Sequence, residues 1–163
     1  MALPVYLWIY EEDGKLLKGG VEVKGREGSI ELVGMQHDIT LPTDNMNGAI
    51  TGAHQHEAYT FEKEIDSSSP LLYRALTTGR TLAQAIFRYY RINYNGFEEE
   101  YFKVVLDKVK VCHVVPIMFD IRDADFENHG YIEHVGLRYE KISWNYIDGN
   151  IEHADGWKES KAV

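Results

Sequence analysis

Short stretches in which apolar and polar residues alternate run through the chain, and such alternation indicates β-strands with one buried face. Tyr59–Asp66 shows the pattern most clearly. Val5–Tyr10 is apolar on both faces, as expected of a strand that is covered on both sides. Ser29–Val33 is predicted to form a shorter second strand. The predicted inner face of the alternating stretch consists of Tyr59, Phe61 and Ile65.

A long hairpin is predicted in the middle of the chain. Its first strand is Thr81–Tyr94, and Asn95-Gly96 is a strong short-range signal for a hairpin. The return strand starts near Glu100, and its apolar positions are first even (Phe102, Val104, Leu106) and then odd (Val109, Val111, Val115). The buried face therefore switches near Asp107–Lys108, which predicts a bulge or a sharp coil in the strand.

The last predicted strand changes face in the same way. Its apolar positions are first odd and then even: Val135, Leu137, Tyr139, Ile142, Trp144 and Tyr146. Two long strands that each change face are expected where a sheet rolls into a barrel or crosses between two packed sheets. The sequence therefore predicts a mainly β fold, either a two-sheet antiparallel β-barrel or a sandwich, with one flanking α-helix, as a single domain over residues 1–163.

The flanking helix is predicted to begin after the clearest strand. Ser69 is a suitable N-cap, Pro70 suits the first turn, and Gly79 stands where a left-handed residue commonly ends a helix. The apolar stripe that would pack on the barrel consists of Leu72, Ala75 and Leu76.

Leu41–His56 differs from the rest of the chain because it has no sustained period of two or of 3.6 residues. It is rich in turn-forming residues, namely Pro42, Asp44, Asn45, Asn47, Gly48 and Gly52. The composition predicts a loop of about fifteen residues, and loops of that length are commonly functional or disordered.

Composition excludes several classes of function. The 26 acidic residues outnumber the 17 basic ones, and the net charge of −9 disfavours binding to nucleic acids and insertion into membranes. Met1–Tyr10 lacks a basic start and a small-residue cleavage site, so we interpret it as a first strand and not as a signal peptide. The single cysteine, Cys112, excludes an intramolecular disulfide and is expected to be a small buried hydrophobe.

His54 and His56 have the spacing that two ligands of one metal ion would use in an extended segment. Beyond Glu57, however, no third ligand is identifiable nearby in the sequence. A solvated loop or a contact between subunits is therefore the favoured interpretation of this pair.

The other chemically suggestive patterns also favour structural roles. Asp123, Asp125 and Glu127 resemble the start of a calcium loop, but the required later glycine and glutamate are missing, which favours an acidic surface turn. Glu98–Glu100 and Asp66 suggest a carboxylate pair for glycoside hydrolysis, yet clustered glutamates after a hairpin are usually a solvated strand start. The sequence predicts no enzyme, and no catalytic, cofactor-binding or metal-ligating residue.

Two motifs resemble the Hcp (haemolysin-coregulated protein) family. The first is FEKEIDSSSP at Phe61–Pro70, running into Leu71–Leu76, and the second is LRYEKISW at Leu137–Trp144, followed by Asp148–Asn150. Further similarities to the family lie at Ala2–Trp8, Arg26–Ile30 and Leu41–Asp44. The resemblance covers essentially the whole chain.

The resemblance implies a function in the bacterial type VI secretion system. Members of the family form the inner tube, in which barrel protomers assemble into homo-hexameric rings that stack inside a contractile sheath. The tube is tipped by a VgrG spike, is expelled into a neighbouring cell and can hold small effector proteins in its lumen. The resemblance also implies a protein that is cytoplasmic before assembly and is then secreted without a signal peptide. The chain is expected to lack the C-terminal toxin domain of some longer relatives.

A ring needs a head-to-tail interface that closes, and a stack needs a second interface that stays open. The long polar loop is the candidate for such contacts, and the resemblance implies that it reaches toward neighbouring subunits. The predicted interface residues are Thr43, Asp44, Asn45, Asn47, Thr51, His54 and Gln55. Two alternatives remain at this point: a phage-type tail-tube protein, and a secreted β-barrel hydrolase that uses the acidic positions or the two histidines.

Overall fold

A computed structural model describes residues 2–128 and 130–157 of the chain. The described part contains ten strands, one α-helix and one short 3₁₀ helix. Their bounds are β1 Val5–Glu11, β2 Ile30–Gln36, β3 Ile39–Thr40, β4 Gln55–His56, β5 Tyr59–Glu64, α1 Ser69–Thr77, β6 Leu82–Ile92, β7 Glu98–Ile117, η1 Ala124–Phe126, β8 Ile132–Arg138, β9 Lys141–Tyr146 and β10 Ile151–Gly156. Within these residues no helix is long and apolar enough to span a membrane.

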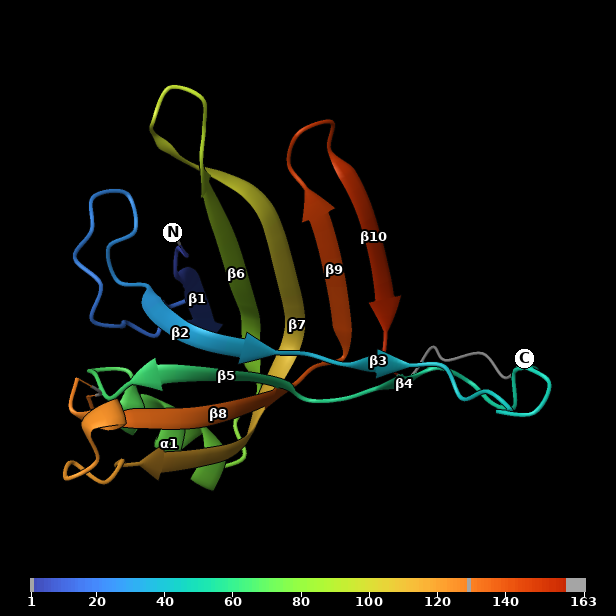
Figure 1. Cartoon of the computed structure of the whole chain (residues 1–163), viewed down its shortest axis with the longest axis horizontal. Coiled ribbons are helices and arrows are strands. Elements are labelled where there is room, and N and C mark those ends of the chain that lie inside the picture. Colours follow the sequence, from blue (N-terminus) through green and yellow to red (C-terminus); the bar gives the residue numbers. More distant parts are fainter. Residues whose placement is uncertain (1, 129, 158–163) are drawn as a thin grey trace.

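Six antiparallel strands close into a barrel, in the order β7-β6-β1-β2-β5-β8 and back to β7. β9 and β10 extend the same sheet outward from β7. In Figure 1, β6, the first half of β7, β9 and β10 stand side by side, while β2, β5 and β8 cross them at a steep angle. The mainly β barrel with one flanking helix that the sequence predicts is therefore confirmed. One apolar cluster fills the interior, with Leu7, Ile9, Phe61, Phe87 and Leu106 among its members.

β7 joins the two directions of the barrel because its buried face changes where the sequence predicts. Val104 and Leu106 are buried, and beyond the switch Val109 and Val111 are buried instead. Lys108 lies between them with a left-handed backbone, φ 52°. At this point β7 leaves β9, its partner up to Asp107, and pairs with β8 from Lys110 onward. The local kink thus lets one long strand belong to both layers.

The prediction was wrong for two residues further along β7. Val115 is 47 % exposed, and Cys112 is exposed as well. The reason is a second irregularity in the pairing with β8, between Val111 and His113, which turns the strand once more. Val114, in place of Val115, packs against the apolar cluster.

The predicted last strand is in fact two strands. β8 ends at Arg138 and β9 begins at Lys141, so the change of face lies in a turn and not in a continuous strand. Tyr139 within this turn is nevertheless buried, and so is Ile142 after it. The apolar periodicity did not predict β10, which pairs with β9 from Ile151 onward.

α1 packs against β7 and buries Leu72 and Ala75, as the predicted stripe requires. The predicted N-cap was wrong, because the helix begins at Ser69 itself and Ser68 occupies the cap position. Ser69 instead points inward, and its Oγ donates a hydrogen bond to Glu133 Oε1 at 2.6 Å. The first turn of the helix is thereby tied to β8.

The third residue on the inner face of β5 is Lys63, and not Ile65 as predicted. Its side chain is fully buried, whereas Ile65 lies just past the end of the strand and is 50 % exposed. Lys63 Nζ lies 2.5 Å from Glu133 Oε1 and 3.1 Å from Asp66 Oδ1. Burial alone would raise the pKa of Asp66, but a hydrogen bond from Ser68 and the charge of Lys63 outweigh it and hold that pKa below its usual value.

Candidate assembly site: the arm and its base

The segment Ile39–His56 projects sideways from the barrel as a narrow hairpin, which we call the arm (Figure 1). At its base β3 pairs with β4, with Ile39 opposite His56. Thr43 and Ile50 form an isolated bridge further out. Most of the predicted loop is indeed outside the strands, but backbone hydrogen bonds order it into a two-stranded ribbon. The extended shape follows because the segment has too few apolar residues to fold back onto the barrel.

Asp44 and Asn47, two of the predicted interface residues, build the turn at the tip of the arm. Asp44 Oδ1 accepts a hydrogen bond from the backbone N–H of Met46 at 2.6 Å, and Asn47 Oδ1 accepts one from Ala49 at 2.8 Å. Gly48 follows with φ 74°, a conformation that glycine adopts without a steric penalty. These polar residues therefore shape the arm, whatever else they contact.

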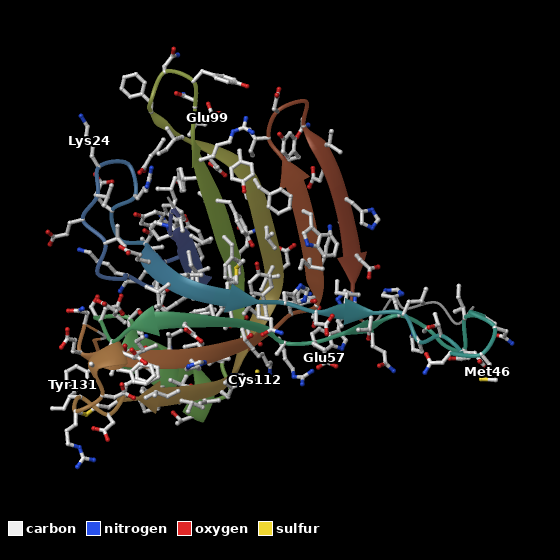
Figure 2. The ribbon with its side chains drawn as sticks, in the orientation of Figure 1. Lys24, Met46, Glu57, Glu99, Cys112 and Tyr131 are labelled. Carbon is white, nitrogen blue, oxygen red and sulfur yellow. The ribbon has the colours of Figure 1, made fainter. Side chains whose placement is uncertain are left out.

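The predicted interface residues fall into two groups. Thr43, Asn45, Asn47, Thr51 and Gln55 are exposed, and Asp44 is half-buried in the tip turn. His54 is also half-buried, but it turns toward Asp155 of β10. The arm also carries exposed apolar side chains that the prediction left out: Leu41 (45 % exposed), Met46 (94 %) and Ile50 (46 %). Figure 2 labels Met46 at the far end of the arm.

The base of the arm is joined to the end of β10 by two histidines and one carboxylate. His54 Nε2 lies 2.6 Å from Asp155 Oδ2, and His56 Nε2 lies 2.7 Å from the same oxygen. The His56 side chain is fully buried, whereas those of His54 and Asp155 are 30 % and 24 % exposed. Burial alone would raise the pKa of Asp155, but the hydrogen bonds from His56 and His54 lower it below its usual value.

Aromatic side chains also contact His56 and hold it in place. Tyr139 Oη lies 2.7 Å from His56 Nδ1 and 2.8 Å from His37 Nε2, so one hydroxyl bridges two imidazoles. Trp157 stacks on the His56 ring with centroids 5.6 Å apart. Burial and the neighbouring His56 lower the pKa of His37, while burial and the charge of Asp155 raise that of Tyr139.

Asp155 is the group that sequence analysis missed when it sought a third partner for the two histidines. It lies 101 residues from His54 along the chain, on a strand that the periodicity did not reveal. Glu57, the neighbour considered instead, is exposed and is labelled in Figure 2 where the arm meets the barrel. No spacing rule would have found Asp155, because the pairing of β10 with β9 alone brings it to the arm.

The acidic residues that could have suggested hydrolysis are bound to cations. Glu98 pairs with Arg26, Glu99 with Arg91 and Glu100 with Arg88, and Asp66 lies beside Lys63. Asp123 Oδ1 accepts a hydrogen bond from the backbone of Asp125 at the start of η1, in agreement with an acidic surface turn. Ion pairs thus account for the acidic residues that follow the hairpin and for Asp66.

Comparison with known proteins identifies close structural relatives. The family model described as "Type VI secretion system effector, Hcp" matches residues 6–146. The "Major exported protein" of Pseudomonas aeruginosa is 27 % identical, over 99 % of both chains. The solved structure of a double mutant of Hcp1 from the E. coli EAEC 042 pathovar is 51 % identical, with a TM-score of 0.87 over 96 % of this chain and 99 % of that one. The secreted protein Hcp3 from Pseudomonas aeruginosa, 24 % identical, shares the fold with a TM-score of 0.78 over 96 % of this chain and 99 % of that one.

Proposed function

The chain belongs to the Hcp family of type VI secretion proteins, and from this membership we propose that it is the subunit of the secretion system's inner tube. Six copies form a ring, and the rings stack into a conduit inside the contractile sheath. The tube is expelled together with the VgrG spike and carries small effector proteins in its lumen. The match of the family model to residues 6–146 carries this proposal, because it spans the barrel, the arm and both motifs.

The work of such a tube is mechanical, and we propose no catalytic step for the chain. The energy of export comes from contraction of the sheath, and the subunit contributes stiffness and interfaces. The pairing of the acidic run with Arg26, Arg88 and Arg91 supports this view, since a general acid or base needs a carboxylate that is available to a substrate. The relation to type VI proteins also favours this assignment over a phage-type tail tube.

We propose that the subunit is made in the cytoplasm and exported by the same system. Support comes from the relative called "Major exported protein" and from the family description, both of which name export.

The arm is the proposed contact between subunits or between rings. It extends beyond the barrel, so it can reach a neighbouring copy (Figure 1). Its apolar side chains Leu41, Met46 and Ile50 are 45 %, 94 % and 46 % exposed within one subunit. Fully burying a side chain such as that of Met46 stabilises an interface by about 1.5–3 kcal/mol. The exposed polar residues around it, Thr43, Asn45, Asn47, Thr51 and Gln55, would form the rim of the contact.

The proposal is tested by replacing residues 42–52 with a short Gly-Ser turn, which retains β3, β4 and both histidines. We expect the barrel to keep its circular dichroism spectrum and its unfolding midpoint, while ring stacking and export fail. Light scattering on a sizing column and negative-stain images would measure the assembly. Met46→Ser is the milder variant, and Met118→Ser, at a residue 61 % exposed after β7, is its matched control.

Two results would contradict parts of the proposal. Unchanged tubes and normal export in the arm variant would remove the arm from the interface. A wild-type chain that stays a compact monomer at high concentration would overturn the tube assignment itself.

A further inference from the structure

The strongest unassigned feature is the convergence of three metal-ligating side chains at the base of the arm. One atom each from His54, His56 and Asp155 lies within 4.8 Å of the other two. The two imidazoles approach the same carboxylate oxygen, and they reach it from the arm, whereas Asp155 comes from β10. Three potential ligands from two separate elements thus meet at one point.

We propose that His54, His56 and Asp155 bind a divalent transition-metal ion, with Zn²⁺ as the representative ion. Two imidazole nitrogens and one carboxylate oxygen form a donor set that suits zinc and its neighbours in the first transition row. Calcium and magnesium prefer sites made of oxygen atoms, so they should not compete. The fourth position remains for water, because His54 and Asp155 are both partly exposed at the edge of the site.

A metal-bound histidine requires a hydrogen-bond partner for its other ring nitrogen, and the surroundings of His56 supply one. When Nε2 binds the metal, Nδ1 carries the proton and donates it to Tyr139 Oη, 2.7 Å away. The Tyr139 hydroxyl can in turn donate to His37 Nε2 at 2.8 Å. Stacking on Trp157 fixes the plane of the His56 ring, so its Nε2 is held toward Asp155.

Binding the metal requires a small opening of the present hydrogen-bonded arrangement. The nitrogen–oxygen distances of 2.6 and 2.7 Å mean that an N–H of each histidine now points at Asp155. Ligands at about 2.0–2.1 Å in a tetrahedron stand roughly 3.3 Å apart, so each histidine nitrogen must move about 0.6–0.7 Å away from the Asp155 oxygen. The metal binds neutral imidazole and ionised carboxylate, so the hydrogen on each Nε2 shifts to Nδ1 when the ion is bound. Acid competes with the metal for all three ligands, and the affinity should therefore fall as the pH is lowered.

The charged residues around the site are compatible with a bound cation. Glu57 and Arg138 line the same hollow as the two histidines, and their opposite charges offset one another. The Arg138 guanidinium lies over the Trp157 ring, 5.0 Å from its centroid. The negative charge of Asp155 is then the ligand charge that a bound metal would neutralise.

The test uses the full chain after dialysis against a chelator. Zn²⁺ is titrated by calorimetry at about pH 7.5 and at about pH 5.5, and Co²⁺ is titrated by visible absorption. We expect one ion per chain, weaker binding at the lower pH, and cobalt bands of the intensity typical of a four-coordinate site. A large excess of Mg²⁺ should leave the binding curve unchanged.

Matched variants separate a metal site from a hydrogen-bonded clamp. Asp155→Asn and His54→Gln keep the shape and polarity of the cluster, and each should weaken Zn²⁺ binding at least 100-fold, whereas Tyr139→Phe should weaken it about 10- to 100-fold. His153→Gln is the control, since His153 is an exposed histidine of β10 that stacks on Trp144. Equal binding by wild type, Asp155→Asn and His54→Gln, or no saturable binding by wild type, would overturn the proposal.

This inference does not depend on the tube assignment. The assembly mass of each sample, measured on the same column, reports on rings, whereas the titration reports on metal. A hexamer without metal would refute the site alone, and a metal-binding monomer would refute the tube alone.

Discussion

Lys63 makes the sharpest prediction about stability, because it is a charged residue with no exposed side-chain surface. Its Nζ donates to the backbone oxygen of Glu64 at 2.9 Å, to Ser69 Oγ at 3.1 Å and to Glu133 Oε1 at 2.5 Å. The Glu133 side chain is itself only 1 % exposed. One cation thus holds β5, β8 and the first turn of α1 together.

Lys63→Met keeps most of the side-chain volume but removes the charge. Glu133 is then a buried carboxylate without a cation, and breaking a buried pair in this way costs about 3–5 kcal/mol. For a chain of this size, each kcal/mol lowers the melting temperature by about 2–4 °C, so the expected decrease is about 6–20 °C. In the double variant Lys63→Met/Glu133→Met no charge of the pair is stranded, and apolar replacements of buried pairs are often neutral. Its free energy of unfolding should lie within about 2 kcal/mol of wild type.

The assay is urea unfolding followed by tryptophan fluorescence, at one fixed protomer concentration because assembly adds to apparent stability. Glu133→Met completes the double-mutant cycle. Lys110→Met, at an exposed lysine of β7, is the control and should change the free energy of unfolding by no more than about 0.5 kcal/mol. A cost below about 1 kcal/mol for Lys63→Met would refute the reasoning. So would a double variant as unstable as the sum of the two single variants.

Two further predictions concern packing and pH. Gly136→Ala would place a Cβ against the imidazole ring of His113, so we expect a loss of about 1–3 kcal/mol in the free energy of urea unfolding. His113→Ala in the same chain should largely restore the stability, and no restoration would show that the strain lies elsewhere. Acid should destabilise the fold in two stages, because a group whose pKa is lowered by folding stabilises the protein above its unfolded pKa and loses that effect as the pH falls. The first stage, below about pH 6.5, belongs to His37 and the second, below about pH 4, to Asp66 and Asp155. Measured unfolding free energies that rise on acidification through either range would contradict this assignment.

Local patterns were enough to predict the class of fold. The change from Leu106 to Val109 on the buried face locates the kink of β7 within two residues, because a shift of one position moves every side chain to the other face. Asn95-Gly96 likewise predicts the β6–β7 hairpin, where Gly96 has φ 81°. Such signals are short-range properties of the chain and need no knowledge of its partners. The second irregularity near Cys112 has no comparable signal, and the pattern was misread there.

The alternation in β5 also places Lys63 on the inner face, although a charged side chain is not expected there from the local sequence. Burial becomes acceptable because Glu133, 70 residues further along the chain, arrives on the neighbouring strand. The same holds for His54, whose spacing from His56 suggested a ligand pair but whose third partner comes from β10. Period and turn chemistry therefore determined most of the strands, the mainly β class of the fold and the position of the long polar loop. The tertiary structure decided which charges and ligands meet, because strand pairing joins residues that are distant along the chain and only their register sets those contacts.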